Sequence, residues 1–490
     1  MSRHFKYPYF LHSSIGVFAT LLLLAIFLRF PYLSISTINW DESTYILMGQ
    51  SLLEGNLPYT QIWELKPPLA FLPYAFFIGI FGKSIEAIRI GAIILVTFSS
   101  YFIFLAAKEL WDRATGLLAG LICVTFLSVD YSGQALMTET IAVLPLSIVA
   151  FLLTKKTTPT NIFWIGLVIS IATLVRLNLA YTVLIMGFFI LYTMWRKNSK
   201  LPLLESFNYG LGGAIPLIII TSTYVFANEL EILKISLIDL PLAYSHGGTS
   251  VLKLSLKVVE LFLKAPLIWI ASLWSMYLIF RRETPQNPTG SHAIFALSIL
   301  VSILMSGHLW KHYLLQLVPI ASIFAAYYFT YHAPWNSRKF TTAVILILCY
   351  NLKPIAVEYF KVINGNQTDL GRSLATTITE ENLNNRPVYL MTHHIAYWLA
   401  NVPAIKSDAI HPSVVAKTNL TSILSGSEKT VVTSLKDILL QKPEIIAKET
   451  PVKFLANNPD AETYLNETIK ANYQKIAEID GINVYKIKPY

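Results

Sequence analysis

The sequence has few cysteines and few charged residues, and both shortages restrict what the chain can be. Only two of its 490 residues are cysteines, Cys123 and Cys349, and each lies inside an apolar run. The polar C-terminal part contains no cysteine, so no disulfide can stabilise it. Charged residues make up 14% of the chain, whereas soluble proteins contain about 25%. Such a composition excludes an ordinary soluble protein.

Several recognisable motifs are also missing. The sequence has no zinc-finger spacing, no phosphate-binding glycine loop and no internal repeat. Its net charge of +9 does not indicate nucleic-acid binding, because Lys and Arg cluster in short loops between apolar runs, where they set membrane topology. Arg3 and Lys6 precede the first apolar run, but no small-residue cleavage site follows before Arg29. We therefore expect an uncleaved first span and not a signal peptide.

Long apolar runs dominate the first 350 residues. Hydrophobic residues make up 54% of the chain, and its mean hydropathy is +0.53. A run of about 20 residues can cross a hydrocarbon core of about 30 Å. We predict about 11 transmembrane helices, at 13–31, 85–107, 114–130, 139–154, 160–176, 178–195, 203–226, 264–280, 293–308, 313–330 and 340–356. The fold class is thus a polytopic α-helical membrane protein, with a membrane domain at 1–357 and a small C-terminal α/β soluble domain at 358–490.

Basic residues occupy every second loop, which predicts the topology. Arg3, Lys6 and the loop clusters that begin at Lys108, Lys155, Arg196, Arg281 and Arg338 would all be cytoplasmic by the positive-inside rule. The N-terminus is then cytoplasmic, and the loop at 32–84 and the tail are extracytoplasmic. This parity requires that the apolar run 69–82 does not cross the membrane. A run of about 14 residues is typical of an interfacial helix.

Two further regions have recognisable patterns. In the tail, 387–392 and 443–447 are predicted strands, 461–472 is a predicted helix, and 476–487 is a predicted hairpin around Asp480-Gly481. In the loop 228–264, two amphipathic surface helices are predicted at 230–242 and 251–263. They are joined at 245–248. This loop is either a lid over a site or only a connector.

The most informative segment is the loop that follows the first span. Adjacent acids, Asp41 and Glu42, and a lysine before two prolines, Lys66, lie just outside the membrane. A carboxylate there can accept a proton from an acceptor hydroxyl or bind a divalent cation. The two acids can equally serve as first-turn residues of a helix at 43–53, where negative charge is favourable.

Lys66 has a restricted backbone, because a residue before proline is confined to extended geometry. At about 4 Å from a phosphate, its charge would contribute about 4 kcal/mol at an effective dielectric constant near 20. The alternative is a lysine that only reaches the aqueous interface from the start of a surface helix. The residues alone leave both interpretations open.

Other ionisable residues lie at the ends of apolar runs. Arg89 and Arg176 lie at outer ends, and Glu139 opens another run. Such residues are functional candidates because burying them in a membrane is costly. A structural Arg–Glu pair is the alternative. A final cluster, His308 to His312 with Lys311, precedes Tyr313 and Gln316. Histidine suits metal, phosphate or proton contacts, although each residue singly also fits a structural interfacial role.

Taken together, these motifs resemble the lipid-phosphate-sugar-dependent glycosyltransferases of the GT-C superfamily. The sequence is most similar to bacterial members of glycosyltransferase family 39, which resemble protein O-mannosyltransferases and the aminoarabinose transferase of lipid A. Order and approximate spacing agree over about residues 10–330. The matching motifs are Asp41-Glu42 with Tyr45, Lys66-Pro67-Pro68-Leu69, Gly82 with Arg89, Thr138-Glu139, and His312-Tyr313-Leu314-Leu315-Gln316 with Pro319.

The resemblance implies an integral-membrane glycosyltransferase of the plasma (inner) membrane. It would move a sugar, with inversion, from a polyprenyl-phosphate donor to an acceptor glycan, lipid or protein. Asp41 would be the catalytic carboxylate, with Glu42 beside it. The other residues fall into two groups. Those implied to contact the donor phosphate are Lys66, Arg89, Arg176, Lys311 and His312, and those implied to line the acceptor cavity are Tyr45, Glu139, Tyr313 and Gln316.

One position departs from the family pattern. Some relatives have an acid directly before the lysine, proposed to hold a metal, whereas this chain has Leu65 there and Glu64 one residue earlier. Metal dependence is therefore left open, with a divalent cation as the candidate cofactor. The alternative functions are a polytopic transporter or lipid flippase and a membrane scaffold whose tail binds a partner.

Overall fold

The chain folds into two compact units. The computed structural model describes residues 8–196, 202–245, 265–282, 288–307, 310–382, 384–405 and 410–489. One unit, here the bundle unit, comprises Met1–Leu33, Ile88–Thr223 and Gly248–Asn366. The other, here the sheet unit, comprises Ser34–Ala87, Tyr224–Gly247 and Gln367–Tyr490. The sheet unit therefore joins the tail to two segments that lie between predicted spans, whereas a domain division at 357/358 stays a prediction.

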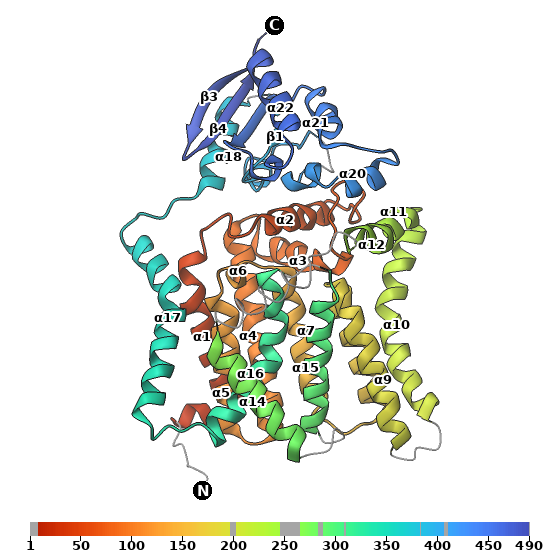
Figure 1. Cartoon of the computed structure of the whole chain (residues 1–490), viewed down its shortest axis with the longest axis vertical. Coiled ribbons are helices and arrows are strands. Elements are labelled where there is room, and N and C mark those ends of the chain that lie inside the picture. Colours follow the sequence, from red (N-terminus) through yellow and green to blue (C-terminus); the bar gives the residue numbers. More distant parts are fainter. Residues whose placement is uncertain are drawn as a thin grey trace. The chain divides into compact units, whose positions relative to one another are not determined.

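The bundle unit consists of long apolar helices that run alongside one another (Figure 1). Two of its helices, α4 and α10, extend by a few residues into the sheet unit. The helices are α1 (Ser14–Arg29), α4 (Ile85–Leu110), α5 (Arg113–Val129), α6 (Tyr131–Gln134), α7 (Thr138–Leu152), α8 (Pro159–Thr173), α9 (Ala180–Arg196), α10 (Pro202–Phe226), α14 (Pro266–Arg282), α15 (Pro288–Leu304), α16 (Val318–Tyr331) and α17 (Arg338–Ile363).

Each predicted span overlaps one of these helices over the described residues, and the α-helical membrane fold is confirmed. Within the described ranges, six helices are long and apolar enough to cross a membrane, and the other apolar helices have 10–17 residues. The number of crossings therefore stays a prediction. The six are Ser14–Tyr32, Ile85–Leu110, Leu177–Arg196, Ser206–Phe226, His312–Tyr331 and Arg338–Ile363.

Local sequence explains where several bundle helices begin and end. The Ser13 hydroxyl accepts a hydrogen bond from the Gly16 N–H at the start of α1, and the Asp112 carboxylate does the same for Thr115 in α5. Each such cap contributes about 1 kcal/mol. At the other end of α1, the buried Arg29 guanidinium donates to the carbonyl of Gly133 at 2.7 Å. That contact anchors the short segment that leads into α7.

The tail folds around a four-stranded mixed sheet. Its strands are β1 (Tyr389–Leu390), β2 (Ile445–Glu449), β3 (Tyr473–Ile479) and β4 (Ile482–Ile487), in the order β1-β2-β4-β3. β1 and β2 are parallel, and the other two pairings are antiparallel. The predicted hairpin is confirmed: Asp480 and Gly481 connect β3 to β4 with φ angles of 43° and 84°. Positive φ at both turn residues is the requirement that Asp-Gly meets best.

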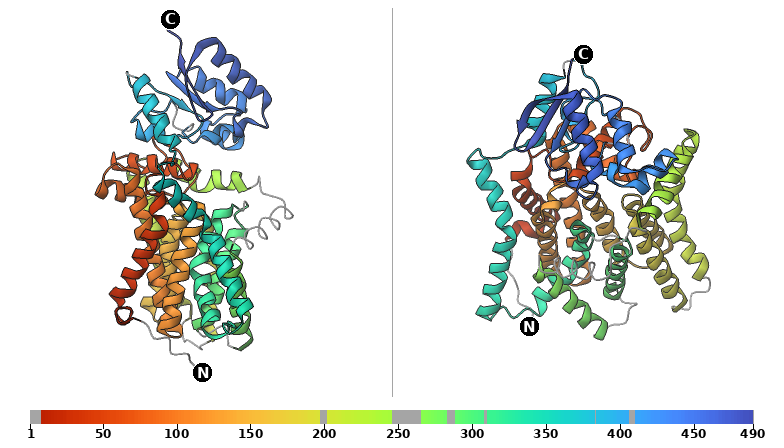
Figure 2. Two further views of the ribbon diagram at one scale, coloured as in Figure 1. Left: turned by 90° about the vertical axis from the view of Figure 1, so that its left-hand side faces the viewer. Right: turned by 45° about the horizontal axis from the view of Figure 1, so that its top comes forward.

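Helices cover both faces of this sheet (Figure 2). They are α18 (Leu370–Glu381), α19 (Ala396–Leu399), α21 (Val431–Leu439) and α22 (Pro459–Asn472), and the tail also contains α20 (Thr418–Ser425). Tyr389 and Ile446 pack against α21 and α22, whereas Leu390 and Ile445 pack against α18 and α19. Alternate strand residues thus point to opposite faces. The predicted α/β tail is confirmed, and β1 is shorter than the predicted strand at 387–392.

The remaining helices of the sheet unit are α2 (Trp40–Leu53), α3 (Leu72–Phe81), α11 (Leu230–Lys234) and α12 (Leu240–Ser245), with a π-helical turn at Ile235–Asp239. α2 and α3 meet at Gly49, where an added Cβ would lie 2.4 Å from the Tyr74 Cβ atom. The predicted helices at 69–82 and 230–242 are confirmed, whereas a membrane-surface position for them stays a prediction. The predicted helix at 251–263 and the joint at 246–248 lie outside the described residues.

Candidate functional site

Asp41 lies in the first turn of α2, which begins at Trp40, three residues before the predicted start at 43. The Asn39 side chain caps the helix by accepting from the Asp41 N–H at 2.9 Å. One carboxylate oxygen of Asp41, Oδ2, accepts a hydrogen bond from the Tyr45 hydroxyl at 3.4 Å. The Asp41 side chain is 35% exposed. The carboxylate is therefore held on one side and accessible on another, and its first-turn position is also favourable for the helix.

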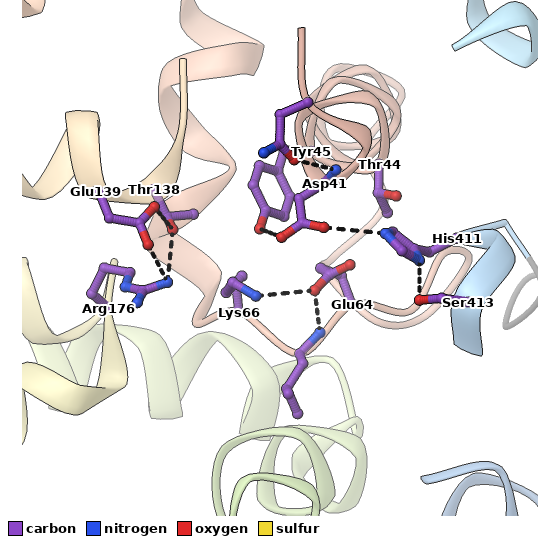
Figure 3. A network of polar contacts seen from close by, with 12 residues as sticks. Asp41, Thr44, Tyr45, Glu64, Lys66, Thr138, Glu139, Arg176, His411 and Ser413 are labelled. Atoms are coloured by element: carbon purple, nitrogen blue, oxygen red, sulfur yellow. Dashed lines mark hydrogen bonds and ion pairs between the residues drawn. The ribbon is translucent and has the colours of Figure 1, made fainter. Parts of the chain in front are cut away.

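The other oxygen of Asp41 is contacted by a histidine of the tail. His411 Nε2 lies 3.2 Å from Asp41 Oδ1, and the Ser413 hydroxyl lies 3.0 Å from His411 Nδ1. Figure 3 shows His411 and Tyr45 reaching the carboxylate from two sides. The sequence motifs did not point to either His411 or Ser413.

A second histidine of the tail contacts α2 one turn further along. His394 Nε2 lies 2.9 Å from the Thr44 hydroxyl, and both residues are buried. Burial lowers the pKa of His394 well below its usual range, and the neighbouring His411 adds to the shift. The ring is therefore neutral near pH 7, because a buried imidazolium would lose its hydration. Leu47 of α2 packs into the same core as Leu390 and Tyr397.

Lys66 lies later in the same loop, and contacts hold both its backbone and its side chain. Its carbonyl accepts a 2.6 Å hydrogen bond from the Tyr59 hydroxyl. Burial raises the pKa of Tyr59 well above its usual range, so that hydroxyl stays protonated and able to donate. Lys66 Nζ lies 5.8 Å from the Tyr45 ring centroid and 3.6 Å from Glu64 Oε1 (Figure 3). Asp41 and Lys66 thus both contact Tyr45.

Glu64 bears on the open question of a metal ion. Its carboxylate faces Lys66 and accepts from the Leu65 N–H at 2.9 Å. Within the described residues, no group of three or more His, Cys, Asp and Glu side chains is arranged to hold a metal ion. A zinc site, which needs at least three protein ligands, is therefore absent from the described residues, and dependence on another divalent cation stays a prediction.

The bundle unit contains a separate buried cluster around Glu139. The Glu139 side chain is fully buried, and its Oε1 lies 2.9 Å from Arg176 NH1 and 3.5 Å from His312 Nε2. Thr138 contacts both Glu139 and Arg176 (Figure 3). The Arg–Glu pair named as an alternative to a functional role therefore exists. Breaking a buried pair of this kind typically costs about 3–5 kcal/mol.

Two further candidates extend this cluster. The Arg176 guanidinium carbon lies 4.3 Å from the Tyr313 ring centroid, an arrangement typical of a cation–π contact. The buried Gln316 accepts from Asn178 Nδ2 at 3.2 Å and donates to the Tyr313 carbonyl. The cluster therefore joins α7, the turn after α8, and the 3₁₀ segment Lys311–Leu317.

Three other candidates are placed by the helix or segment that contains them. Glu42 is buried in the first turn of α2, and Arg89 is buried near the start of α4. Lys311 begins the 3₁₀ segment, and its side chain lies outside the described part of the chain, as does His308. The structure thus brings Asp41, Tyr45 and Lys66 together in one unit. It brings Glu139, Arg176, His312, Tyr313 and Gln316 together in the other.

Sequence reasoning missed the tail's contribution to the first cluster. His393 and His394 follow the predicted strand at 387–392 directly, and β1 and β2 are parallel neighbours. Ligand sites of open α/β sheets lie beyond the carboxyl ends of such strands. That position was the signal that could have drawn attention to the tail's histidines, although nothing local pairs them with α2.

A family model described as dolichyl-phosphate-mannose-protein mannosyltransferase matches residues 65–226. The matched stretch includes Lys66, Arg89, Glu139 and Arg176, and it covers less than half of the chain. A comparison with curated proteins finds no significant match.

Solved structures match the chain over nearly its whole length. ArnT from Cupriavidus metallidurans, bound to undecaprenyl phosphate, aligns with 96% of this chain and 97% of its own, at 13% identity and a TM-score of 0.64. The chain has the GT-C fold. The oligosaccharyltransferase AglB from Archaeoglobus fulgidus, in complex with an inhibitory peptide and a dolichol-phosphate, aligns with 97% of this chain and 74% of its own, at 11% identity and a TM-score of 0.51.

The GT-C fold confirms the predicted class of membrane protein. At identities of 11–13% the similarity establishes the fold alone, and one fold can serve several chemistries. Function must therefore be argued from the two clusters.

Proposed function

We propose that the protein is an integral-membrane glycosyltransferase that uses a polyprenyl-phosphate-linked sugar. The observation that carries this proposal is the arrangement around Tyr45, whose hydroxyl contacts the Asp41 carboxylate and whose ring faces the Lys66 ammonium. An acid that can take a proton and a cation that can bind a phosphate therefore lie on either side of one residue. The family-model match, and the lipid phosphates bound to ArnT and AglB, support the same chemistry.

The proposed reaction uses Asp41 on the acceptor. Asp41 takes the proton from an acceptor hydroxyl or orients that hydroxyl, and the acceptor oxygen attacks the anomeric carbon of the donor sugar. The bond from that carbon to the phosphate oxygen breaks, and polyprenyl phosphate leaves with the electron pair. General-base assistance of this kind typically contributes about 10²–10⁴-fold to the rate.

Lys66 stabilises the leaving group in this scheme. Negative charge gathers on the phosphate as the glycosidic bond breaks, and a fixed cation favours that charge in the transition state. The Tyr59 hydrogen bond and Pro67 restrict the Lys66 backbone. Glu64 and the Tyr45 ring contact its ammonium, which reduces the ordering needed when the donor binds. Glu42 supports the loop and takes no part in proton transfer.

Roles for the remaining candidate residues follow the family resemblance. We assign Arg89, Arg176, Lys311 and His312 to the donor phosphate, and Tyr45, Glu139, Tyr313 and Gln316 to the cavity for the acceptor. Arg176 already has Glu139, Thr138 and Tyr313 as partners. We therefore assign it a second task, which is to hold the 3₁₀ segment that carries His312.

The acceptor is a glycan, a lipid or a protein, and the sugar is not specified by these residues. Nothing in the fold or in the described residues favours the transporter or flippase alternative. The experiment that tests the function compares the glycolipids and glycans of cells with and without this protein by mass spectrometry. We expect one glycosylated species to disappear with the protein. Identical profiles would contradict the proposal.

We also propose a location and orientation. The protein lies in the plasma (inner) membrane, with its N-terminus in the cytoplasm and both the loop at 32–84 and the tail outside. Basic-loop parity supports this orientation. It is also the side on which a polyprenyl-linked sugar would meet an extracytoplasmic acceptor.

Cysteine labelling tests this orientation. In a Cys349→Ser background, where the remaining Cys123 is buried, Gln61→Cys and Ser373→Cys place thiols at exposed positions. Both should react with a membrane-impermeant maleimide in intact cells. Lys156→Cys, in a predicted cytoplasmic loop, should react only after the cells are permeabilised. The reverse pattern would overturn the orientation.

A further inference from the structure

The Asp41 carboxylate is contacted by a side chain from a distant part of the sequence. His411 Nε2 lies 3.2 Å from Asp41 Oδ1, across 370 positions of sequence. The His411 side chain is only 10% exposed, whereas the Asp41 side chain is 35% exposed. A nearly buried ring thus faces a carboxylate that still has an accessible side.

The hydrogen-bond geometry around His411 defines what the ring can do. The Ser413 hydroxyl lies 3.0 Å from Nδ1. When this hydroxyl donates to Nδ1, the ring proton is on Nε2, and Nε2–H donates to Asp41. A neutral donor orients a carboxylate without placing a full positive charge against it. Asp41 then remains a better proton acceptor than it would be in an ion pair.

The tail is attached to α2 by contacts that do not involve His411. Thr44 bonds to His394, Leu47 packs into the tail core, and Gln50 accepts a hydrogen bond from the Trp398 indole at 3.3 Å. These α2 residues are spaced by three positions, so they share one face of the helix. A second attachment joins the Ser36 N–H to Asp369 at 3.0 Å. Removing the His411 side chain therefore leaves the attachment of the tail intact.

The His411 contact holds the Asp41 carboxylate more closely than the hydrogen bond from Tyr45, which is long at 3.4 Å. A general base must lie about 2.6–3.2 Å from the group whose proton it takes. A misplacement of about 1 Å can cost about 100-fold in rate.

We propose that His411 is a positioning residue: it holds the Asp41 carboxylate through Nε2–H, and Ser413 selects the required tautomer. The proposal rests on the function proposed above. It makes the tail a working part of the glycosyltransferase, because the tail supplies the group that orients the catalytic acid.

The test uses full-length variants reconstituted into membrane vesicles from cells that lack the protein. The rate is read from the glycosylated species that depends on the wild-type protein, and binding is read with undecaprenyl phosphate as the probe. His411→Ala should lower the rate about 100-fold and leave undecaprenyl phosphate affinity unchanged. His411→Gln should restore most of the rate, because its amide N–H can reach the position of Nε2.

A double variant of Asp41 and His411 distinguishes a positioning role for His411 from a packing role. In an Asp41→Asn background, His411→Ala should cause no further loss, because the group that it orients has already been disabled. His332→Gln, a histidine change in the bundle unit, is the matched control and should leave the rate unchanged. Thermal unfolding of each variant checks that it folds.

Three outcomes would count against the proposal. A His411→Ala variant with the wild-type rate would overturn it, and so would a His411→Gln variant as slow as His411→Ala, which would indicate ring packing. Additive losses in the double variant would also overturn it. Failure of the proposed function looks different: Asp41→Asn would then keep the wild-type rate, whatever happens at His411.

Discussion

Asp41→Asn should abolish turnover while leaving donor binding largely unchanged. The substitution keeps the shape of the side chain, so that Tyr45 and His411 can still contact it. It removes the negative charge that accepts the proton. Loss of general-base assistance should lower the rate by about 10²–10⁴-fold. The measurement is the rate of sugar transfer, together with the affinity for undecaprenyl phosphate, in the same preparation.

Glu42→Gln is the matched control for Asp41→Asn. Glu42 neighbours Asp41 in the first turn of α2 but is buried. Adjacent residues of a helix point in different directions, so the two acids should not share one role. Glu42→Gln should reduce activity less, chiefly by loosening the loop. An active Asp41→Asn variant beside an inactive Glu42→Gln variant would reverse the assignment, and two active variants would exclude both acids.

Lys66→Ala should weaken binding of undecaprenyl phosphate strongly. The Lys66 side chain is 19% exposed, and its ammonium lies beside Glu64 and Tyr45. Loss of one charge-assisted contact costs about 1.5–3 kcal/mol, which corresponds to an increase in Kd of about 10- to 150-fold. Binding can be followed by the change in tryptophan fluorescence on titration with the lipid phosphate.

Two variants separate phosphate binding from other roles of this lysine. Glu64→Gln removes the partner of Lys66 and should not weaken binding, whereas an equal loss would mean that the Glu64–Lys66 pair acts only structurally. Lys83→Ala removes a lysine of the same unit that contacts Asn401 and the Trp398 ring. It should lower the thermal stability of the protein and leave the affinity for undecaprenyl phosphate unchanged.

Much of the fold could be predicted from sequence, because its strongest determinants are local. Apolar runs located the bundle helices, and Asp480-Gly481 located the hairpin through the positive φ angles that both residues adopt. The start of α2 was predicted three residues late. The helix begins after Asn39, whose side chain caps it. Asn39 is polar, so a search for apolar periodicity does not detect this start.

The candidate site was only partly predictable for the same reason. Asp41, Tyr45 and Lys66 lie within 26 positions of one another, so a single segment pointed to them. The contact between Asp41 and His411 depends on how the tail packs on Leu47 and Thr44. Such packing depends on two cores formed by residues far apart in sequence. No periodicity or motif in one segment encodes it.

Release of polyprenyl phosphate tests the central claim most directly. Purified protein in vesicles would be supplied with donor lipids and with an extract that contains the acceptor, and free polyprenyl phosphate would be measured over time. We expect wild-type protein to release it only when the acceptor is present, and Asp41→Asn to release almost none. Movement of the intact lipid-linked sugar between leaflets, with no cleavage by the wild-type protein, would contradict the account and indicate a flippase.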